Sequence, residues 1–238
     1  MPEPNLEATH DVGLQSMGGA RVLPLRSMNR RHLFLLAGLT PAFAFVACGK
    51  GKPSLAPLKS DARVLALGDS LTAGYGASPE QAWPSVLAPL TGWQIDNQGV
   101  NGDTSAGALE RLPALLAASS YDAVLVGIGG NDMLRGVSPQ ATRENVAAIV
   151  RAALAHTKYV ALIATPAPDA LRATVGSLSD AGFYKDVASA EKVLLIPDVY
   201  STVLSDAALR SDRIHANAQG YAAIAQKLAD KLKAAGWR

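Results

Sequence analysis

The sequence predicts an α/β protein in which helices cover both faces of a parallel sheet. From Asp61 to the end of the chain, short apolar segments alternate with longer segments of helical periodicity, as parallel sheets with crossover helices require. Four of the five apolar segments lack strict alternation, which is typical of strands buried on both faces. No internal repeat or second linker interrupts the unit, so we expect one domain over residues 61–238.

The five apolar segments are the predicted strands. In chain order they are Arg63–Leu67, Trp93–Val100, Ala123–Ile128, Tyr159–Ala164 and Val193–Val199.

Helical segments lie between and after these strands. A helix is expected over residues 104–116, although Pro113 should interrupt it. Ser138 is a plausible N-cap, with Pro139 in the first helical position of the next helix. The apolar face of this helix is formed by Val146, Ile149, Val150, Ala153 and Leu154. The apolar face of the C-terminal helix is formed by Tyr221, Ile224, Ala225, Leu228 and Leu232. The segment 169–190 has no clear pattern.

The composition excludes several classes of protein. The 238 residues include 22 basic and 20 acidic side chains, a formal net charge of +2, which gives no reason to expect nucleic acid as a partner. One cysteine excludes an internal disulfide and any zinc site that needs two cysteine ligands. The oligomeric state stays open.

The N-terminal region has the pattern of an export signal. Arg30 and Arg31 precede 15 uncharged residues, Leu33–Ala47, which are too few for a membrane-spanning helix and contain Pro41. The only cysteine, Cys48, follows directly. The four residues 45–48 resemble a bacterial lipobox with Phe in place of the usual Leu, which implies a lipid on Cys48. Residues 29–34 faintly resemble a twin-arginine signal, so the export route stays open.

This pattern divides the chain into three parts. We expect residues 1–47 to be an extension and signal peptide, with Met28 a better start than Met1, and residues 48–60 to be a lipidated cysteine and flexible tether. Twelve tether residues would span roughly 20 Å. The protein would then be exported to the periplasm or cell envelope and anchored by its lipid, at the inner or the outer membrane. The alternative is that Cys48 is a buried residue of a core helix.

Four polar loops follow the predicted strands. They are Gly68–Thr72, Asn101–Thr104, Gly129–Asp132 and, after the fifth strand and a short helical stretch, Asp212–His215. Because ligands bind outside the carboxyl ends of parallel strands, we expect these loops to form one site.

The residues of these loops suit acyl transfer. A serine hydroxyl becomes a nucleophile when an imidazole takes its proton and a carboxylate orients that imidazole. Asp212 and His215 are three residues apart, so a helical turn would place both side chains on one face, within reach of Ser70. The Ser70 amide, the Gly102 amide and the Asn131 side chain could stabilise the developing oxyanion. A metal site of Asp69, Asp212 and His215 is a weaker alternative, because zinc sites usually have more histidine or cysteine ligands.

These loops also carry a resemblance. Gly68-Asp69-Ser70-Leu71, Gly102, Gly130-Asn131-Asp132 and Asp212-x-x-His215 are similar, in order, to the four blocks of the SGNH hydrolase superfamily of GDSL esterases and lipases. GDSLTAGYG, NGDTS, RLPALL and GGNDMLRG resemble its branch of bacterial thioesterase I, lysophospholipase L1 and arylesterases. The resemblance implies a flavodoxin-like α/β/α fold, Ser70 as nucleophile, His215 as base, Asp212 as its orienter and no cofactor. Ala216 departs from the proline that often follows the histidine.

Each role has a structural alternative. Ser70 could be only an N-cap, while Asp69 is expected to organise its turn and Asp132 to be structural. His156 closes a predicted helix, where a cation suits the dipole, and we assign it no catalytic role.

The substrate stays open among carboxylic esters, thioesters, aryl esters and lysophospholipids. The segment 166–184, with Leu171, Val175, Leu178 and Phe183, is the expected wall of a substrate groove, although core packing explains it equally well. A non-catalytic envelope lipoprotein that binds lipid or glycan and an acetyl-sugar esterase are the alternatives to a general esterase.

Overall fold

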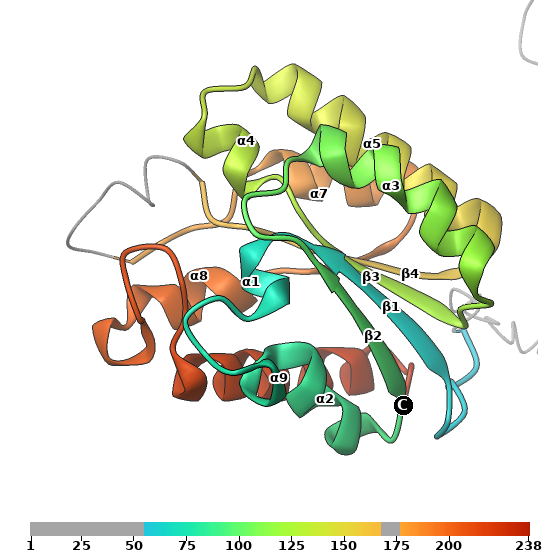
Figure 1. Ribbon diagram of the computed structural model, residues 1–238. Coiled ribbons are helices and arrows are strands. Elements are labelled where there is room, and N and C mark those ends of the chain that lie inside the picture. Colours follow the sequence, from blue (N-terminus) through green and yellow to red (C-terminus); the bar gives the residue numbers. More distant parts are fainter. Residues whose placement is uncertain (1–54, 168–176) are drawn as a thin grey trace, which may run out of the picture. The chain divides into compact units, whose positions relative to one another are not determined.

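A five-stranded parallel sheet forms the centre of the protein. The computed structural model describes residues 55–167 and 177–238. The strand order is β2-β1-β3-β4-β5 (Figure 1), which is the flavodoxin-like order. The strands are β1 (Arg63–Gly68), β2 (Gln94–Gly99), β3 (Ala123–Gly127), β4 (Tyr159–Ile163) and β5 (Leu194–Ile196). All five predicted strands and the predicted fold class are confirmed.

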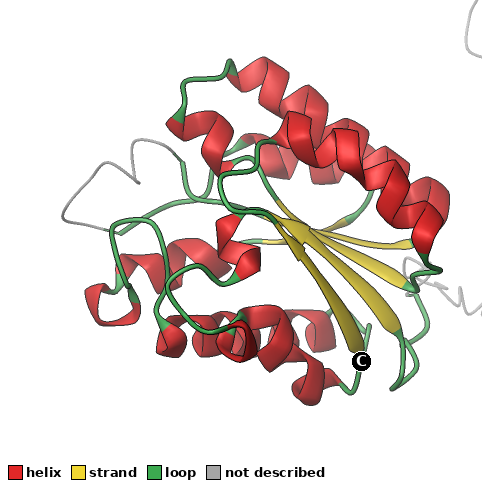
Figure 2. Ribbon diagram, viewed as in Figure 1, coloured by secondary structure: helices red, strands yellow, loops and turns green. Residues whose placement is uncertain are grey.

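Helices cover both faces of this sheet, which makes three layers (Figure 2). One face is covered by α2 (Trp83–Thr91), α8 (Val199–Ser205) and α9 (Ala218–Ala234), and the other by α3 (Ser105–Ala118), α5 (Pro139–His156) and α7 (Phe183–Glu191). Short helices lie among the loops: α1 (Ser70–Ala73), α4 (Gly130–Leu134), and the 3₁₀ turns η1 (Pro79–Gln81) and η2 (Ala207–Leu209). Ser138 caps α5, as predicted, and Asn217 caps α9.

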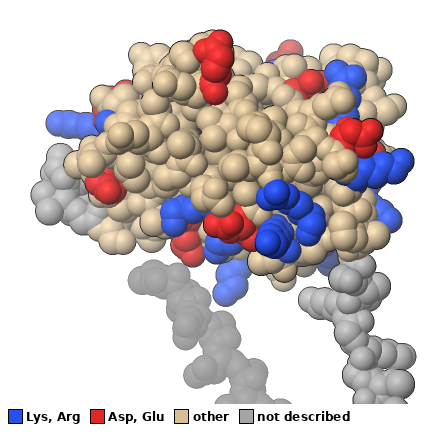
Figure 3. All heavy atoms as spheres, turned by 90° about the horizontal axis from the view of Figure 1, so that it is seen from below, with Lys and Arg blue, Asp and Glu red and all other residues tan. Residues whose placement is uncertain are grey.

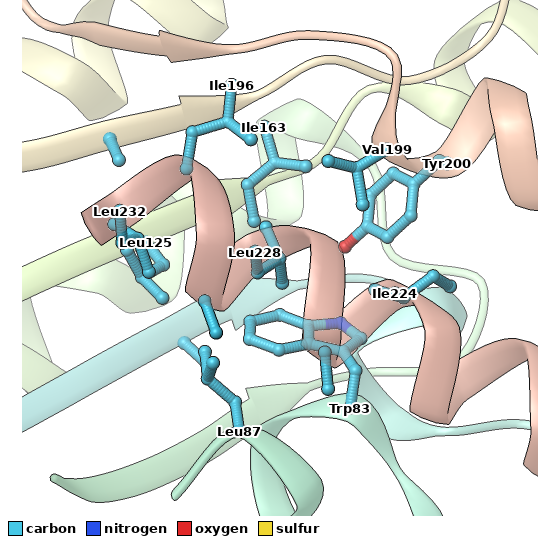
Figure 4. Close-up of a cluster of buried hydrophobic side chains, with 14 of the residues drawn as sticks. Trp83, Leu87, Leu125, Ile163, Ile196, Val199, Tyr200, Ile224, Leu228 and Leu232 are labelled. Atoms are coloured by element: carbon cyan, nitrogen blue, oxygen red, sulfur yellow. The ribbon is translucent and has the colours of Figure 1, made fainter. Parts of the chain in front are cut away.

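Alternate residues of the central strands supply two hydrophobic cores. In β1, Val64 and Ala66 pack toward α2 and α9, whereas Leu65 and Leu67 pack toward α3 and α5. Figure 4 shows the first core, where Trp83 of α2 lies among side chains of α8 and α9. Full burial on both faces explains why β1, β3 and β4 lack alternation in the sequence.

Two elements differ from the sequence prediction by more than single residues at their ends. The last strand ends at Ile196, because Pro197 cannot donate to a ladder and Asp198 adopts a positive φ of 63° before α8. Helix α3 continues through Pro113, which we expected to interrupt it. Pro113 is exposed, so the carbonyl that loses its N–H partner is on the solvent side of the helix.

The ambiguous segment 169–190 is partly clarified. Residues 168–176 lie outside the described part of the chain, and the C-terminal part of the segment forms most of α7.

The predicted tether is shorter than expected. Leu55 and Leu58 pack against the first core, the Leu58 N–H donates to the Trp237 carbonyl at 2.9 Å, and the Tyr159 hydroxyl donates to the Ala56 carbonyl at 2.6 Å. Residues 55–60 therefore belong to the folded body rather than to a flexible tether, because their apolar side chains gain burial there. Residues 1–54, with the expected signal peptide, start codon and Cys48, lie outside the described residues.

The surface of the described body carries charges of both signs. On the face of α2 and α9, Lys and Arg side chains lie beside Asp and Glu side chains within a mostly uncharged surface (Figure 3). None of the helices described is both long and apolar enough to cross a membrane.

Candidate active site

A pocket at the carboxyl ends of the strands collects most of the predicted site residues. It lies where the strand order reverses, between β1 and β3, so the loops after both strands contribute to it. Its lining residues are Asp69, Ser70, Leu71, Gly130, Asn131, Leu134, Thr165, Pro166, Leu204, Ile214 and His215.

Ser70, His215 and Asp212 form a continuous chain of contacts. The Ser70 hydroxyl lies 2.9 Å from Nε2 of His215, and Nδ1 of His215 lies 2.7 Å from Oδ2 of Asp212. The Ser70 and His215 side chains are largely buried, whereas the Asp212 side chain is 46% exposed. With Nδ1 protonated toward Asp212, Nε2 is free to accept the serine proton, which is the arrangement that general-base catalysis requires.

The segment that carries Asp212 and His215 is a bend rather than the helical turn that the spacing suggested. Oδ1 of Asp212 accepts the N–H groups of Ile214 and His215, both at 2.8 Å. The same carboxylate thus fixes the loop backbone with one oxygen and the imidazole with the other. Asn217 adds support, since its side chain donates to the Ala208 and Arg210 carbonyls.

Asp69, not Ser70, is the N-cap of α1. Its Oδ1 accepts the Leu71 N–H at 3.0 Å, and Ser70 is the first helical residue. The alternative in which Ser70 is only an N-cap is therefore wrong, and the expected role of Asp69 in the turn is confirmed. Gly68 lets α1 pack closely on β1, because a Cβ there would lie 2.1 Å from Oγ1 of Thr72.

The two other predicted oxyanion groups lie on neighbouring loops. Asn131 lines the pocket from α4, and its Nδ2 donates to the Asp103 carbonyl at 2.9 Å. Gly102, with a positive φ of 74°, is not in the pocket wall but lies on the same loop as Asp103. The Asn131 amide has a second N–H that this bond leaves free.

Two carboxylates beside the site have structural partners. Asp132 is buried and accepts the Ser105 N–H at 2.7 Å, which confirms its structural role. Asp103 pairs with Arg111 at 2.9 Å, and Arg111 also donates to the Gly68 carbonyl at 3.0 Å. These contacts join the loops after β1, β2 and β3 into one rigid edge.

The pKa values of the two aspartates at the site shift in opposite directions. Burial alone would raise the pKa of Asp212, but hydrogen bonds from the His215 side chain and from the two loop N–H groups outweigh it and hold the pKa below its ordinary value. For Asp69, burial raises the pKa to about 7, with further repulsion from Asp103 and Asp132, against lowering hydrogen bonds from the backbone N–H groups of Leu71 and of Asp69 itself.

Two residues with contacts at the site were not singled out from the sequence. The Tyr75 ring packs on the His215 ring, with centroids 4.5 Å apart, and Tyr75 is 51% exposed. Arg135 follows α4 and donates from Nη2 to the Gly102 carbonyl at 2.7 Å. Both lie in stretches that resemble the family blocks, and this resemblance was the only signal that could have directed attention to them.

His156 is held differently from what we expected. It ends α5, but its Nε2 accepts the Tyr121 N–H at 3.0 Å. A cationic imidazole could not accept this bond, so His156 acts as a neutral acceptor rather than as a cation at the helix terminus.

Only a small part of the expected groove wall lines the pocket. Pro166 lines it, but Leu178 is buried in the first core and Phe183 stacks on Tyr184. Leu171 and Val175 lie outside the described residues. The apolar lining comes instead from Leu71, Leu134, Leu204 and Ile214, which belong to helices and loops at the carboxyl ends of the strands.

The metal alternative gains no support from the arrangement of ligands. Within residues 55–167 and 177–238, no three His, Cys, Asp or Glu side chains are grouped so that they could hold a metal ion.

A family model described as the GDSL-like Lipase/Acylhydrolase family matches residues 66–223. The chain belongs to this family. It is therefore an enzyme that hydrolyses ester bonds, and the predicted resemblance is confirmed.

Relatives of known name agree with this membership. Esterase TesA of Pseudomonas aeruginosa is 34% identical over 142 residues, which are 56% of this chain and 69% of the relative. Thioesterase 1/protease 1/lysophospholipase L1 of Escherichia coli K12 is 35% identical over 178 residues, 71% of this chain and 83% of the relative. The crystal structure of the esterase EstA from Pseudoalteromonas sp. matches with a TM-score of 0.63 and 26% identity, covering 73% of this chain and 98% of EstA.

Proposed function

We propose that this acylhydrolase works through an acyl-enzyme on Ser70, with His215 as general base and Asp212 as the group that orients it. The observation that carries the proposal is the continuous contact from Ser70 Oγ through both nitrogens of His215 to Asp212. A protein that only binds lipid or glycan has no need of this chain, so we do not favour that alternative.

The reaction follows from this geometry. The Ser70 oxygen attacks the ester carbonyl while its proton moves to Nε2 of His215. The imidazolium, stabilised by Asp212, then gives this proton to the leaving alkoxide, and the acyl group stays on Ser70. In the second half a water molecule takes the place of the alcohol, and the same base activates it.

The oxyanion of both tetrahedral intermediates would be stabilised by three donors. We assign this role to the amides of Ser70 and Gly102 and to the free N–H of Asn131. The bond from Asn131 to the Asp103 carbonyl supports the assignment, because it fixes the side-chain amide beside the pocket before substrate arrives.

The substrate class is an ester or lipid with an apolar acyl group. The apolar side chains of the pocket support it, as do the names of the relatives, which include an esterase, a thioesterase and a lysophospholipase. No contact in the described residues favours an acetylated sugar.

The proposed nucleophile is tested by Ser70→Ala with p-nitrophenyl butyrate as substrate. We expect kcat/KM to fall by at least about 10³-fold, because the attacking atom is lost. Ser85→Ala is the matched control, since Ser85 is exposed on α2 and should leave the rate unchanged. A fluorophosphonate should label the wild type and not Ser70→Ala. Full activity of Ser70→Ala would contradict the assignment.

We further propose that the protein is exported and anchored in the cell envelope by a lipid on Cys48. The basic residues 30–31, the uncharged run 33–47 and the lipobox-like residues 45–48 support this proposal.

A further inference from the structure

Arg135 is an exposed cation at the end of α4, directly after the pocket residue Leu134. Nη2 donates to the Gly102 carbonyl at 2.7 Å, so the guanidinium spans from the end of α4 to the loop after β2. Two other residues of α4, Asn131 and Leu134, line the pocket. The arginine thus lies next to the group proposed to bind the oxyanion.

No carboxylate neutralises this cation in the part of the chain that the structure describes: none of the ion pairs there, with nitrogen and oxygen within 4.0 Å, includes Arg135. Two acidic residues close to this contact are engaged elsewhere. Asp132, three residues before Arg135, accepts the Ser105 N–H, and Asp103, which follows Gly102, pairs with Arg111. A guanidinium has five N–H donors, and the bond to Gly102 uses one of them. Because the residue is exposed, the remaining donors are available to a ligand.

The two sides of Ser70 differ in character. Toward β4 and β5, the pocket wall contains the apolar Pro166 and Leu204 beside Thr165, whose hydroxyl is hydrogen-bonded to Tyr184. Toward β2, the guanidinium of Arg135 lies over the loop of Gly102. An ester whose carbonyl lies at Ser70 would therefore have one half in apolar and the other half in cationic surroundings.

We propose that Arg135 determines specificity by binding an anionic group, a phosphate or a carboxylate, on the leaving alcohol, while the acyl group occupies the apolar side. The guanidinium fork matches the paired oxygens of both anions. This inference rests on the proposed function, because it takes Ser70 as the point of attack.

Three esters that share one acyl group and one carbon skeleton provide the test: glycerol monobutyrate, the butyryl ester of glyceric acid, and butyryl glycerol 3-phosphate. We expect the full-length wild type to have a higher kcat/KM for the two anionic esters than for the neutral one. Arg135→Gln should lower the ratio of anionic to neutral kcat/KM by about five- to tenfold, as expected for a partly exposed charge-assisted contact. Arg135→Lys should retain part of the ratio, and raising the salt concentration should reduce the wild-type preference.

Arg238→Gln is the matched control, because it also removes one exposed arginine. Its neighbour Trp237 packs on Tyr159 at the start of β4, whereas Ser70 follows the end of β1. Arg238→Gln should leave the ratio unchanged. The ratio of anionic to neutral kcat/KM separates anion recognition from a general disturbance of the loops, because such a disturbance lowers kcat/KM for all three esters. An unchanged ratio in Arg135→Gln, or an equal loss for all three esters, would overturn the inference. A loss for only one anion would identify which of the two is recognised. If the wild type hydrolyses none of these esters and no p-nitrophenyl butyrate, the proposed function itself fails.

Discussion

At the scale of single residues, the site places two carboxylates in opposite environments. Asp212 is half-exposed and held ionised by donors, whereas Asp69 is 3% exposed and close to Asp103 and Asp132. The first arrangement keeps Asp212 negatively charged, so that it can stabilise the imidazolium of His215. The second makes the turn beside Ser70 sensitive to pH in the neutral range, because burial raises the pKa of Asp69 to about 7.

Asp69→Asn should change how stability depends on pH. Between the unfolded pKa of 3.8 and the folded pKa of about 7, the folded state binds more protons than the unfolded state. The free energy of unfolding therefore falls as pH rises through this window, by at most about 1.4 kcal/mol per pH unit, and this contribution becomes constant above it. Asparagine does not titrate and can still cap α1 through its oxygen.

Urea unfolding at pH 4.5 and pH 8 measures this effect. Relative to the wild type, Asp69→Asn should gain stability at pH 8 compared with pH 4.5. Asp61→Asn, which removes an exposed carboxylate, serves as control. The same difference from wild type at both pH values would show that Asp69 does not titrate in this window.

Some residues of the site could be predicted from the sequence, and others could not. Ser70, Asp212 and His215 were found because each lies in a short polar block and because a serine needs a base and an orienter. Tyr75 and Arg135 were missed, since their contacts depend on how loops distant in sequence pack together. Asp69 was assigned correctly to the turn, but its burial, and with it the raised pKa, depends on the folded structure.

At the scale of elements, the start of α9 supports the catalytic loop. Asn217 caps the helix by accepting the Gly220 N–H at 3.0 Å, and its amide nitrogen holds the carbonyls of Ala208 and Arg210. One side chain thus fixes both the helix and the bend that carries Asp212 and His215. The spacing of Asp212 and His215 suggested a helical turn, but a spacing of three fits an Asx-stabilised bend equally well, so the sequence alone does not distinguish the two.

Asn217→Ala should therefore affect stability and catalysis together. We expect a loss of about 1 kcal/mol or more from the helix cap, measured by urea unfolding, and a lower kcat as the bend loosens. Gln219→Ala, an exposed substitution in the first turn of the same helix, is the control and should change neither quantity. An Asn217→Ala enzyme with wild-type kcat would show that the bend is held without this residue.

At the scale of the whole molecule, the alternation of apolar and helical segments predicted the layers correctly. The central strands β1, β3 and β4 are buried on both faces, so their continuous apolar sequences predict strands without ambiguity. The edge strands β2 and β5 are shorter than predicted. The order of the strands came from the family resemblance, because periodicity does not state which strands are neighbours. The extent of the tether was overestimated, since only packing reveals that residues 55–60 are held on the body.

The proposed anchor is tested on the processed protein from a bacterial envelope fraction. Mass spectrometry should identify an acylated Cys48 as the first residue. Cys48→Ala should release the protein from the membrane fraction, while its esterase activity persists, because residues 55–238 include the whole candidate site. A Ser54→Ala variant, which keeps the cysteine, should remain in the membrane fraction. An unmodified N-terminus at another residue would refute the anchor.

The bond between Leu58 and Trp237 has a further consequence for how the enzyme can be joined to other molecules. It brings the two ends of the folded body side by side, near the start of β4, whereas Ser70 follows the end of β1. Neighbouring ends permit insertion of the body into a surface loop of a host protein through short connections. A cargo or solid support attached at either end would leave the mouth of the pocket open, because parallel strands separate their starts from their ends.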